Sequence, residues 1–197
     1  MLGFLLTSLI VELTPGPNMG TLASLTLHVG RRGGLAVVAG IALGLAIVGV
    51  LAAFGLAALI ADVPLAYQLL RWGGVLYMLY LAYDTWRDAS GGDADFESDG
   101  SLFLRGLTIN LLNPKAAVFY LAILPTFIDP ARGSVLVQNL ILVVIFVAVA
   151  TTVHAGIVLL AVRLRPLLVS GAGERRFRRV LAGSMALIAL WFAWETR

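Results

Sequence analysis

Residues 33–61 read GGLAVVAGIALGLAIVGVLAAFGLAALIA, 29 consecutive positions without Asp, Glu, Lys or Arg. A second charge-free stretch of 30 residues covers positions 133–162. A bilayer core about 30 Å thick is crossed by a helix of about 20 apolar residues, so either stretch can span it. Over all 197 residues, 60% are apolar and 13% are charged, against about 45–50% and about 25% in soluble domains. The composition therefore excludes an ordinary soluble protein and predicts an integral membrane protein.

Four further apolar segments complete a set of six predicted spans. Each contains or adjoins one or two polar groups, such as Glu12, Arg71 or Lys115. These segments are residues 2–27, 65–86, 102–127 and 180–194. Six spans with short connections use nearly all of the chain and leave no room for a separate soluble domain. We therefore expect residues 1–197 to form one all-α transmembrane domain of six helices.

The arginines predict the orientation of these spans, because short cytoplasmic loops carry an excess of basic residues. With six spans, only Arg132 and Arg197 lie on the side that holds the two termini. The odd-numbered loops hold ten arginines on the opposite side: Arg31, Arg32, Arg87, Arg105, Arg163, Arg165, Arg175, Arg176, Arg178 and Arg179. We therefore expect both termini to lie outside the cytoplasm.

Two of the predicted spans contain sequences that interrupt a helix. Thr14-Pro15-Gly16-Pro17-Asn18 lies near the middle of the first span, and its prolines lack N–H groups and push the preceding residues toward extended backbone. In the fourth span, Asn113 is a good N-cap and Pro114 a good first residue, so a new half-helix should begin there. Irregular backbone at membrane depth is tolerated where protein or a watery cavity satisfies the freed polar groups. The two breaks therefore predict a cavity.

The breaks also predict an internal repeat. They lie 97 to 99 residues apart, in the first and fourth spans. Interrupted segments at corresponding positions of two halves point to a transporter site between structural repeats. A three-span repeat crosses the membrane an odd number of times, so its second copy must enter from the opposite side. We expect two inverted three-helix repeats, about residues 1–90 and 101–197, with helices 1 and 4 broken near mid-membrane.

Glu12 and Lys115 are ionisable residues beside the two breaks. Such groups cost about 2.5–3.5 kcal/mol at the centre of a membrane helix on insertion scales. Glu12 lies in the last turn before one break and Lys115 in the first turn after the other, so the helix dipole opposes each charge by about 0.3–1 kcal/mol. The two residues can compensate each other as a structural ion pair.

A substrate can also compensate these charges. Lys115 and the half-helix N-termini at Pro17 and Pro114 can hold a carboxylate. Glu12 and the backbone carbonyls freed at the breaks can hold an ammonium group. This set of groups has the polarity of an amino-acid zwitterion.

Other polar side chains near the breaks have two interpretations each. Asn18, Asn110 and Asn113 can bind substrate, or they can serve in helix capping and interhelical hydrogen bonds. His154 lies inside the predicted fifth span, where it can relay protons or be a hydrogen-bonded interior residue.

Gly40 and Gly44 form a Gly-x-x-x-Gly pattern in the second span. Small residues at this spacing let the backbones of two membrane helices approach closely. We expect such packing within the chain or across a dimer.

These motifs together resemble the LysE/RhtB superfamily of bacterial amino-acid exporters, the lysine and homoserine/threonine type. Residues 14–18 are similar to its Pro-Gly-Pro signature, residues 30–44 to its glycine-spaced second span and residues 73–83 to its third span. The most specific match is GLTINLLNPKA at 106–116, continuing to LPTF at 124–127. The likeness covers residues 11–130, and the last two spans match mainly in hydropathy.

The resemblance implies a small exporter of amino acids or related metabolites in the bacterial inner membrane, driven by the proton gradient or the membrane potential. It also implies a homodimer. Many relatives have Asp where this chain has Asn18, so any proton coupling by that carboxylate must fall here to Glu12 or to the substrate. Carried onto this chain, the motif adds these candidate substrate- or ion-binding residues to Glu12: Pro15, Gly16, Pro17, Asn18, Asn110, Asn113, Pro114 and Lys115.

Two other functions compete with this interpretation: export of a metal cation or another small solute by a similar fold, and a membrane-embedded enzyme. The chain has no cysteine and no His-Glu-x-x-His motif. Its two histidines are His28 and His154. Thiolate metal ligands and a nucleophilic thiol are therefore missing. This inventory favours moving a solute over transforming one. We expect no catalytic residue, metal, cofactor or nucleic-acid partner.

The topology can be tested with single cysteines, because the natural chain supplies no background. The orientation predicts that Ser90 faces the cytoplasm and Gly133 the outside. A membrane-impermeant maleimide applied to intact cells should label Gly133→Cys and leave Ser90→Cys unlabelled until the cells are opened. Labelling of both positions from the same side would overturn the predicted topology.

Overall fold

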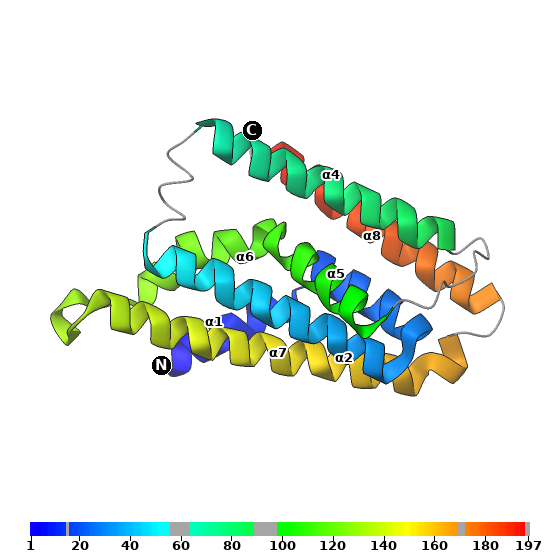
Figure 1. Cartoon of the computed structure of the whole chain (residues 1–197), viewed down its shortest axis with the longest axis horizontal. Coiled ribbons are helices and arrows are strands. Elements are labelled where there is room, and N and C mark those ends of the chain that lie inside the picture. The colour runs from blue at the N-terminus through cyan, green and yellow to red at the C-terminus, as the bar shows by residue number, and fades with distance from the viewer. Residues whose placement is uncertain (15, 56–63, 89–97, 169–171, 196–197) are drawn as a thin grey trace.

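A computed structural model describes the chain except for residues 15, 56–63, 89–97, 169–171 and 196–197. Pro15 and Ser90 therefore lie outside the described residues, as does the end of the predicted second span. The described part is all helical and contains no strand (Figure 1). Its elements are α1 (Leu2–Leu13), α2 (Pro17–Ala53), α4 (Pro64–Asp88), α5 (Asp99–Leu111), α6 (Pro114–Val118), the π-helical turn η1 (Phe119–Ile123), the 3-10 turns η2 (Leu124–Phe127) and η3 (Pro130–Arg132), α7 (Val135–Leu168) and α8 (Ala172–Glu195).

The first helix break lies where the Pro-Gly-Pro sequence predicts it. Thr14 ends α1, and its N–H donates to the carbonyl of Ile10 at 3.0 Å. Gly16 is extended, with φ −158° and ψ 175°, and Pro17 is the first residue of α2. A proline fits this position because its missing N–H would have no partner in the first helical turn.

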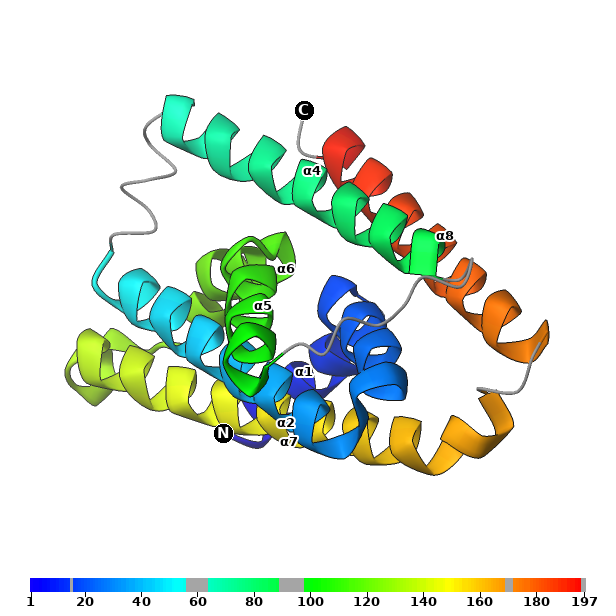
Figure 2. The ribbon, with the colours of Figure 1, turned by 45° about the vertical axis from the view of Figure 1, so that its right-hand side comes forward.

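A turn at Gly30 divides α2 into two arms, residues 17–29 and 31–53. Gly30 has φ 73° and ψ −169°, a left-handed φ that glycine adopts without steric cost. The chain changes direction sharply there, as Figure 1 and Figure 2 show in blue. The first arm therefore continues α1 across the break, and the second arm corresponds to the predicted second span.

The second break confirms that a half-helix begins at Pro114. α5 ends at Leu111, and the Asn113 Oδ1 accepts a hydrogen bond from the Lys115 N–H at 3.0 Å as the N-cap of α6. The two helical pieces on either side, Asp99–Leu111 and Lys115–Phe127, meet at a bend of 51°.

Two described helices are long and apolar enough to cross a membrane. They are Asn18–Ala53, whose most apolar stretch of 18 residues has a mean hydropathy of 2.7, and Val135–Pro166, whose most apolar stretch of the same length has 2.5. The bent pair around Asn113 supplies a third crossing if it is counted as one span. These helices support a membrane protein, whereas the count of six spans and their inverted repeats stay predictions.

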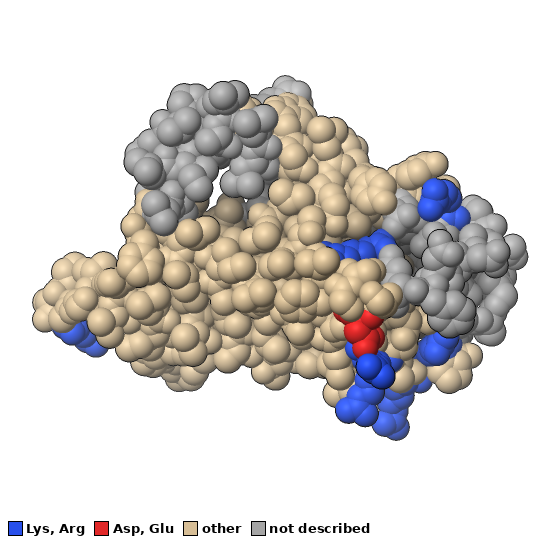
Figure 3. Space-filling view, viewed as in Figure 1, with Lys and Arg blue, Asp and Glu red and all other residues tan. Residues whose placement is uncertain are grey.

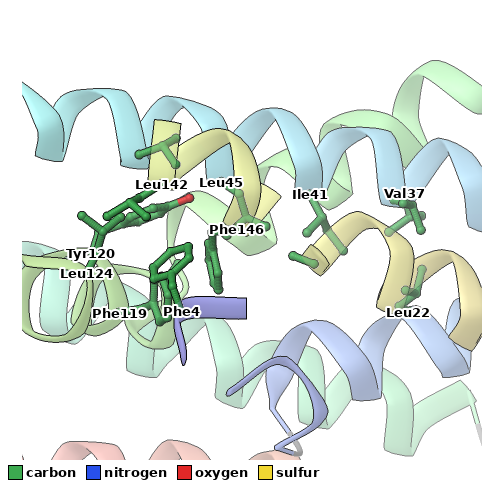
Figure 4. Close-up of a cluster of buried hydrophobic side chains, with 14 of the residues drawn as sticks. Phe4, Leu22, Val37, Ile41, Leu45, Phe119, Tyr120, Leu124, Leu142 and Phe146 are labelled. Carbon is green, nitrogen blue, oxygen red and sulfur yellow. The ribbon is translucent and has the colours of Figure 1, made fainter. Parts of the chain in front are cut away.

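The second arm of α2 lies at the centre of the fold, packed against α5 and α7, while α1 packs on α7 and α4 runs along α8 (Figures 1 and 2). The largest buried cluster joins α1, α2, η1 and α7 (Figure 4). Within it, the rings of Phe119 and Phe146 stack with centroids 3.7 Å apart, and Phe4 lies 5.9 Å from Phe119. This aromatic packing holds the segment after the second break against α1.

Glycines let the backbones of α2 and α5 touch. A Cβ added at Gly40 would collide with the carbonyl oxygen of Phe103, and one added at Gly106 would collide with the carbonyl oxygen of Val37. At Gly44 an added Cβ would lie 2.9 Å from the Cβ of Asn110. The close packing predicted from Gly-x-x-x-Gly is therefore confirmed, within the chain.

Basic side chains gather at one end of the molecule. Figure 3 shows most of the visible Lys and Arg side chains at the right, the end where α2 turns at Gly30 and α5 begins. There Arg32 forms an exposed ion pair with Asp99 at 2.7 Å. Arg132, paired with Asp129 at 3.0 Å, lies toward the opposite end, where α1 begins. Which end faces the cytoplasm stays a prediction.

The contact between α2 and α5 predicts a strong effect of one methyl group. Gly40→Ala should lower the stability by about 1–3 kcal/mol, because the added carbon forces two backbones apart. Gly156→Ala is the matched control, since a Cβ there meets nothing within 4 Å and alanine favours a helix by about 0.8–1.0 kcal/mol over glycine. Thermal unfolding in detergent should give a Tm below the natural protein for Gly40→Ala only. Equal Tm values for the two variants would contradict this packing.

Candidate functional site

A small cavity lies where the two helix breaks meet. Its volume is about 10 Å³, which is room for about one water molecule. Five residues singled out from the sequence contribute to its wall, together with His154 and three apolar residues. The lining is Glu12, Gly16, Asn18, Met19, Leu45, Asn113, Lys115, Ala116 and His154.

Lys115 connects the two breaks directly. Its Nζ, carried by the first turn of α6, donates a hydrogen bond of 2.9 Å to the carbonyl oxygen of Thr14 at the end of α1. A Cβ added at Gly16 would lie 3.5 Å from the Lys115 Cδ, so the lysine stem lies alongside this glycine. The ammonium group therefore satisfies a backbone carbonyl that the break leaves without a helical donor.

Glu12 contacts His154 rather than Lys115. The Glu12 Oε2 lies 3.4 Å from the His154 Nε2, and the two residues are 6% and 1% exposed. In the described part of the chain, Glu12 and Lys115 form no ion pair within 4.0 Å, although both line the cavity and lie close enough to interact electrostatically. The structural ion pair, one of the two alternatives for these residues, is therefore not formed in this conformation.

One interpretation of His154 was a hydrogen-bonded interior residue, and the structure differs from it. Among the described residues neither ring nitrogen has a hydrogen-bond partner, and both nitrogens are buried. A group near Glu12 that the sequence did not single out is Tyr120, whose buried hydroxyl also lacks a partner there. The one available signal for His154 was its place as the sole histidine in the 30-residue charge-free stretch.

Asn18 and Asn110 join the two broken segments from the inside. The Asn18 Nδ2 donates to the Asn110 Oδ1 at 2.9 Å, between side chains 92 residues apart. Both residues are buried, and their other amide atoms, the Asn18 Oδ1 and the Asn110 Nδ2, have no hydrogen-bond partner within the described structure. Asn18 lines the cavity, whereas Asn110 does not. The Asn18 Oδ1 is thus an acceptor beside the cavity that has no partner among the described residues.

The remaining predicted residues shape the backbone. Asn113 lines the cavity and caps α6, while Pro17 and Pro114 each begin a helix. Pro15 lies outside the described residues. Three cavity residues missed by the sequence reasoning are apolar, Met19, Leu45 and Ala116, and their sequence context does not distinguish them from other membrane-helix residues.

The cavity presents a carboxylate, an ammonium group, an imidazole and an amide within one small volume. Opposite charges on two sides of a site complement a molecule that carries both charges. Within the described residues, no group of three or more His, Asp or Glu side chains could hold a metal ion. At its present volume the cavity admits only a water molecule, so binding of a larger solute requires the helices around the breaks to move.

Comparison with known proteins places this chain in a family. The chain is 38% identical to a homoserine/homoserine lactone efflux protein of Salmonella typhimurium, over 82% of this chain and 80% of that protein. It is 37% identical to the protein of the same name in Salmonella typhi, over the same shares, and 35% identical to an uncharacterized membrane protein of Vibrio cholerae, over 83% and 81%. No solved structure matches the chain.

The family profile described as LysE type translocator matches residues 9–196. The match therefore includes both helix breaks, the cavity between them and the two long apolar helices. Its description is that of a translocator rather than an enzyme. The relatives and this profile agree, and this chain belongs to the LysE type translocator family.

Proposed function

We propose that this protein is a secondary-active exporter of amino acids or closely related small metabolites in the bacterial inner membrane, driven by the proton gradient or the membrane potential. The observation that carries the proposal is the cavity between two interrupted helices, with Glu12 and Lys115 in its wall. Buried charges are costly in a membrane, and those that are retained mark substrate or ion pathways. Membership in a translocator family and the efflux proteins among its relatives support the direction of transport.

The substrate is an amino compound bound through its ends. A substrate carboxylate takes the Lys115 ammonium from the Thr14 carbonyl, to which it is bonded at 2.9 Å. A substrate ammonium group binds the Glu12 carboxylate. Asn18 adds its free amide oxygen as a further acceptor.

Glu12 is the contact that homoserine and its lactone would share. Both compounds have an α-amino group, whereas the carboxylate of homoserine is an ester in the lactone. The two relatives are described as efflux proteins for this pair of compounds. A site that accepts both compounds depends on the amino end more than on the carboxyl end.

The proposal includes a membrane arrangement. Six helices form two inverted repeats, residues 1–90 and 101–197, within one domain, and both termini lie outside the cytoplasm. The broken segments at Gly16 and Asn113, the contact of α2 with α7 and the contact of α4 with α8 support the pairing of corresponding elements. The exporter works as a homodimer surrounded by membrane lipid.

Lys115→Met tests the cavity directly. It removes the ammonium group and keeps an apolar stem of similar length, so efflux should fall by about tenfold or more, because a hydrogen bond to a charged group contributes about 1.5–3 kcal/mol. Cells that lack their own exporters are loaded with single labelled amino acids, and efflux is measured at equal membrane expression. Arg132→Met is the control, since this cation is 82% exposed and lies outside the cavity. Unchanged efflux by Lys115→Met would sink the assignment of this cavity.

The amino group of the substrate should be essential. We expect expression of the natural protein to relieve the growth inhibition caused by homoserine, its lactone or another amino acid. Expression should bring no relief from inhibition by the N-acetylated form of the same compound. N-acetylation removes the positive charge that Glu12 binds and leaves the other end unchanged. Equal export of the free and the N-acetylated form would contradict the role of Glu12. Absence of efflux for every amino acid and lactone would contradict the proposed function itself.

A further inference from the structure

His154 lines the cavity, but the proposed binding of the substrate gives it no role. It is 1% exposed in the middle of α7, and within the described structure both ring nitrogens lack a hydrogen-bond partner. Buried polar atoms are almost always hydrogen-bonded, and an exception marks strain, a functional role or a missing partner. The nearest charged group is Glu12, whose Oε2 lies 3.4 Å from the His154 Nε2.

The Glu12 carboxylate and the His154 Nε2 can share one added proton. The carboxylate and the neutral imidazole approach each other without the geometry of a hydrogen bond, since the Nε2 is unpartnered. A proton on Nε2 would create an imidazolium beside a carboxylate, and the pair could then shorten into a charge-assisted hydrogen bond. Histidine suits this task because its side chain exists either as a neutral imidazole or as an imidazolium, and the neutral form accepts one proton on a ring nitrogen.

We propose that Glu12 and His154 form the proton-binding site of this exporter, where a proton and the ammonium group of the substrate exclude each other. The inference rests on the proposed function, because it assigns the coupling proton to two residues of the same cavity. It gives Glu12 two alternating partners. In one state the partner is the protonated His154, and in the other state it is the substrate.

The charges around the pair explain the exclusion. The groups that face it are Lys115 from α6, Tyr120 from η1 and the neutral amide of Asn18 from α2. Without the extra proton, the Glu12 carboxylate and the Lys115 ammonium balance, and the site complements a zwitterion. With the proton on His154, the site gains one positive charge and the carboxylate is occupied, so a substrate ammonium group is repelled.

Mutually exclusive binding is the condition for exchange of a proton against a substrate. The proton enters from the water outside, binds the His154 Nε2 and leaves to the water inside, and no other bond is made or broken. The unprotonated site then binds one zwitterion from the inside and returns to face the outside, where it releases the zwitterion and completes the cycle. Each cycle moves one positive charge inward, so both the pH gradient and the membrane potential drive export.

His154→Gln tests the inference in proteoliposomes. Glutamine keeps a polar side chain but cannot carry the proton. We expect accumulation driven by a pH gradient to fall by about tenfold more than exchange of labelled for unlabelled substrate without any gradient, a typical size for coupling between sites. His28→Gln is the matched control, because the other histidine of the chain lies outside the cavity and is half-buried in α2.

Histidine-selective 15N NMR supplies a readout that does not need transport. The protein has two histidines, so the spectrum of His28→Gln assigns the signals of His154. We expect the His154 ring signals to titrate, substrate to displace its proton, and Glu12→Gln to change the titration midpoint. Signals of His154 that ignore both substrate and Glu12→Gln would overturn the inference, even if a transport variant failed to fold.

The two hypotheses fail in different ways. If the natural protein exchanges no amino acid or lactone, the proposed function fails. If it exchanges substrate and His154→Gln still accumulates that substrate in response to a pH gradient, the exporter stands and the proton site at Glu12 and His154 is wrong.

Discussion

The fold depends on satisfying the backbone polar groups at the two helix breaks. Unpaired N–H and C=O groups are costly in hydrocarbon, so a break is stable only if another part of the protein reaches it. Here each break supplies what the other needs, because the Lys115 Nζ donates to the Thr14 carbonyl and the amides of Asn18 and Asn110 bond across the interface. The same meeting point creates the cavity, so the stability of the breaks and the polarity of the site have one origin.

Close approach of α2 and α5 makes this meeting possible. Gly40, Gly44 and Gly106 leave no room for a Cβ between the two helices, and the second break directly follows α5. With larger residues, the Asn110 side chain could not reach Asn18, and the cavity wall would open. The aromatic stack of Phe119 on Phe146 then fixes the chain beyond the second break against the core (Figure 4). Close packing thus holds the polar groups of the two breaks within reach of each other.

Much of this architecture could be predicted from local sequence. Charge-free stretches gave the membrane assignment, and Pro17 and Asn113-Pro114 gave the starts of two helices, because proline and an N-cap act on their immediate neighbours. The close packing at Gly40 and Gly44 also follows from their spacing. The partners of Glu12 and Lys115 could not be predicted, since an ionisable side chain in a membrane helix needs compensation from any element within reach. The sequence allowed an ion pair between them or contact of both with a substrate, and the fold places His154 beside Glu12 and the Thr14 carbonyl beside Lys115.

The sequence by itself therefore determined that the chain is a helical membrane protein with helix interruptions at two places and with opposite charges beside them. Only the tertiary structure decided which polar groups meet. It brought His154 from α7 to within 3.4 Å of Glu12 on α1 and left its ring nitrogens without hydrogen-bond partners among the described residues. The physical reason is that helix starts and stops are local, whereas a contact between residues 142 positions apart depends on how three-dimensional packing orients each helix.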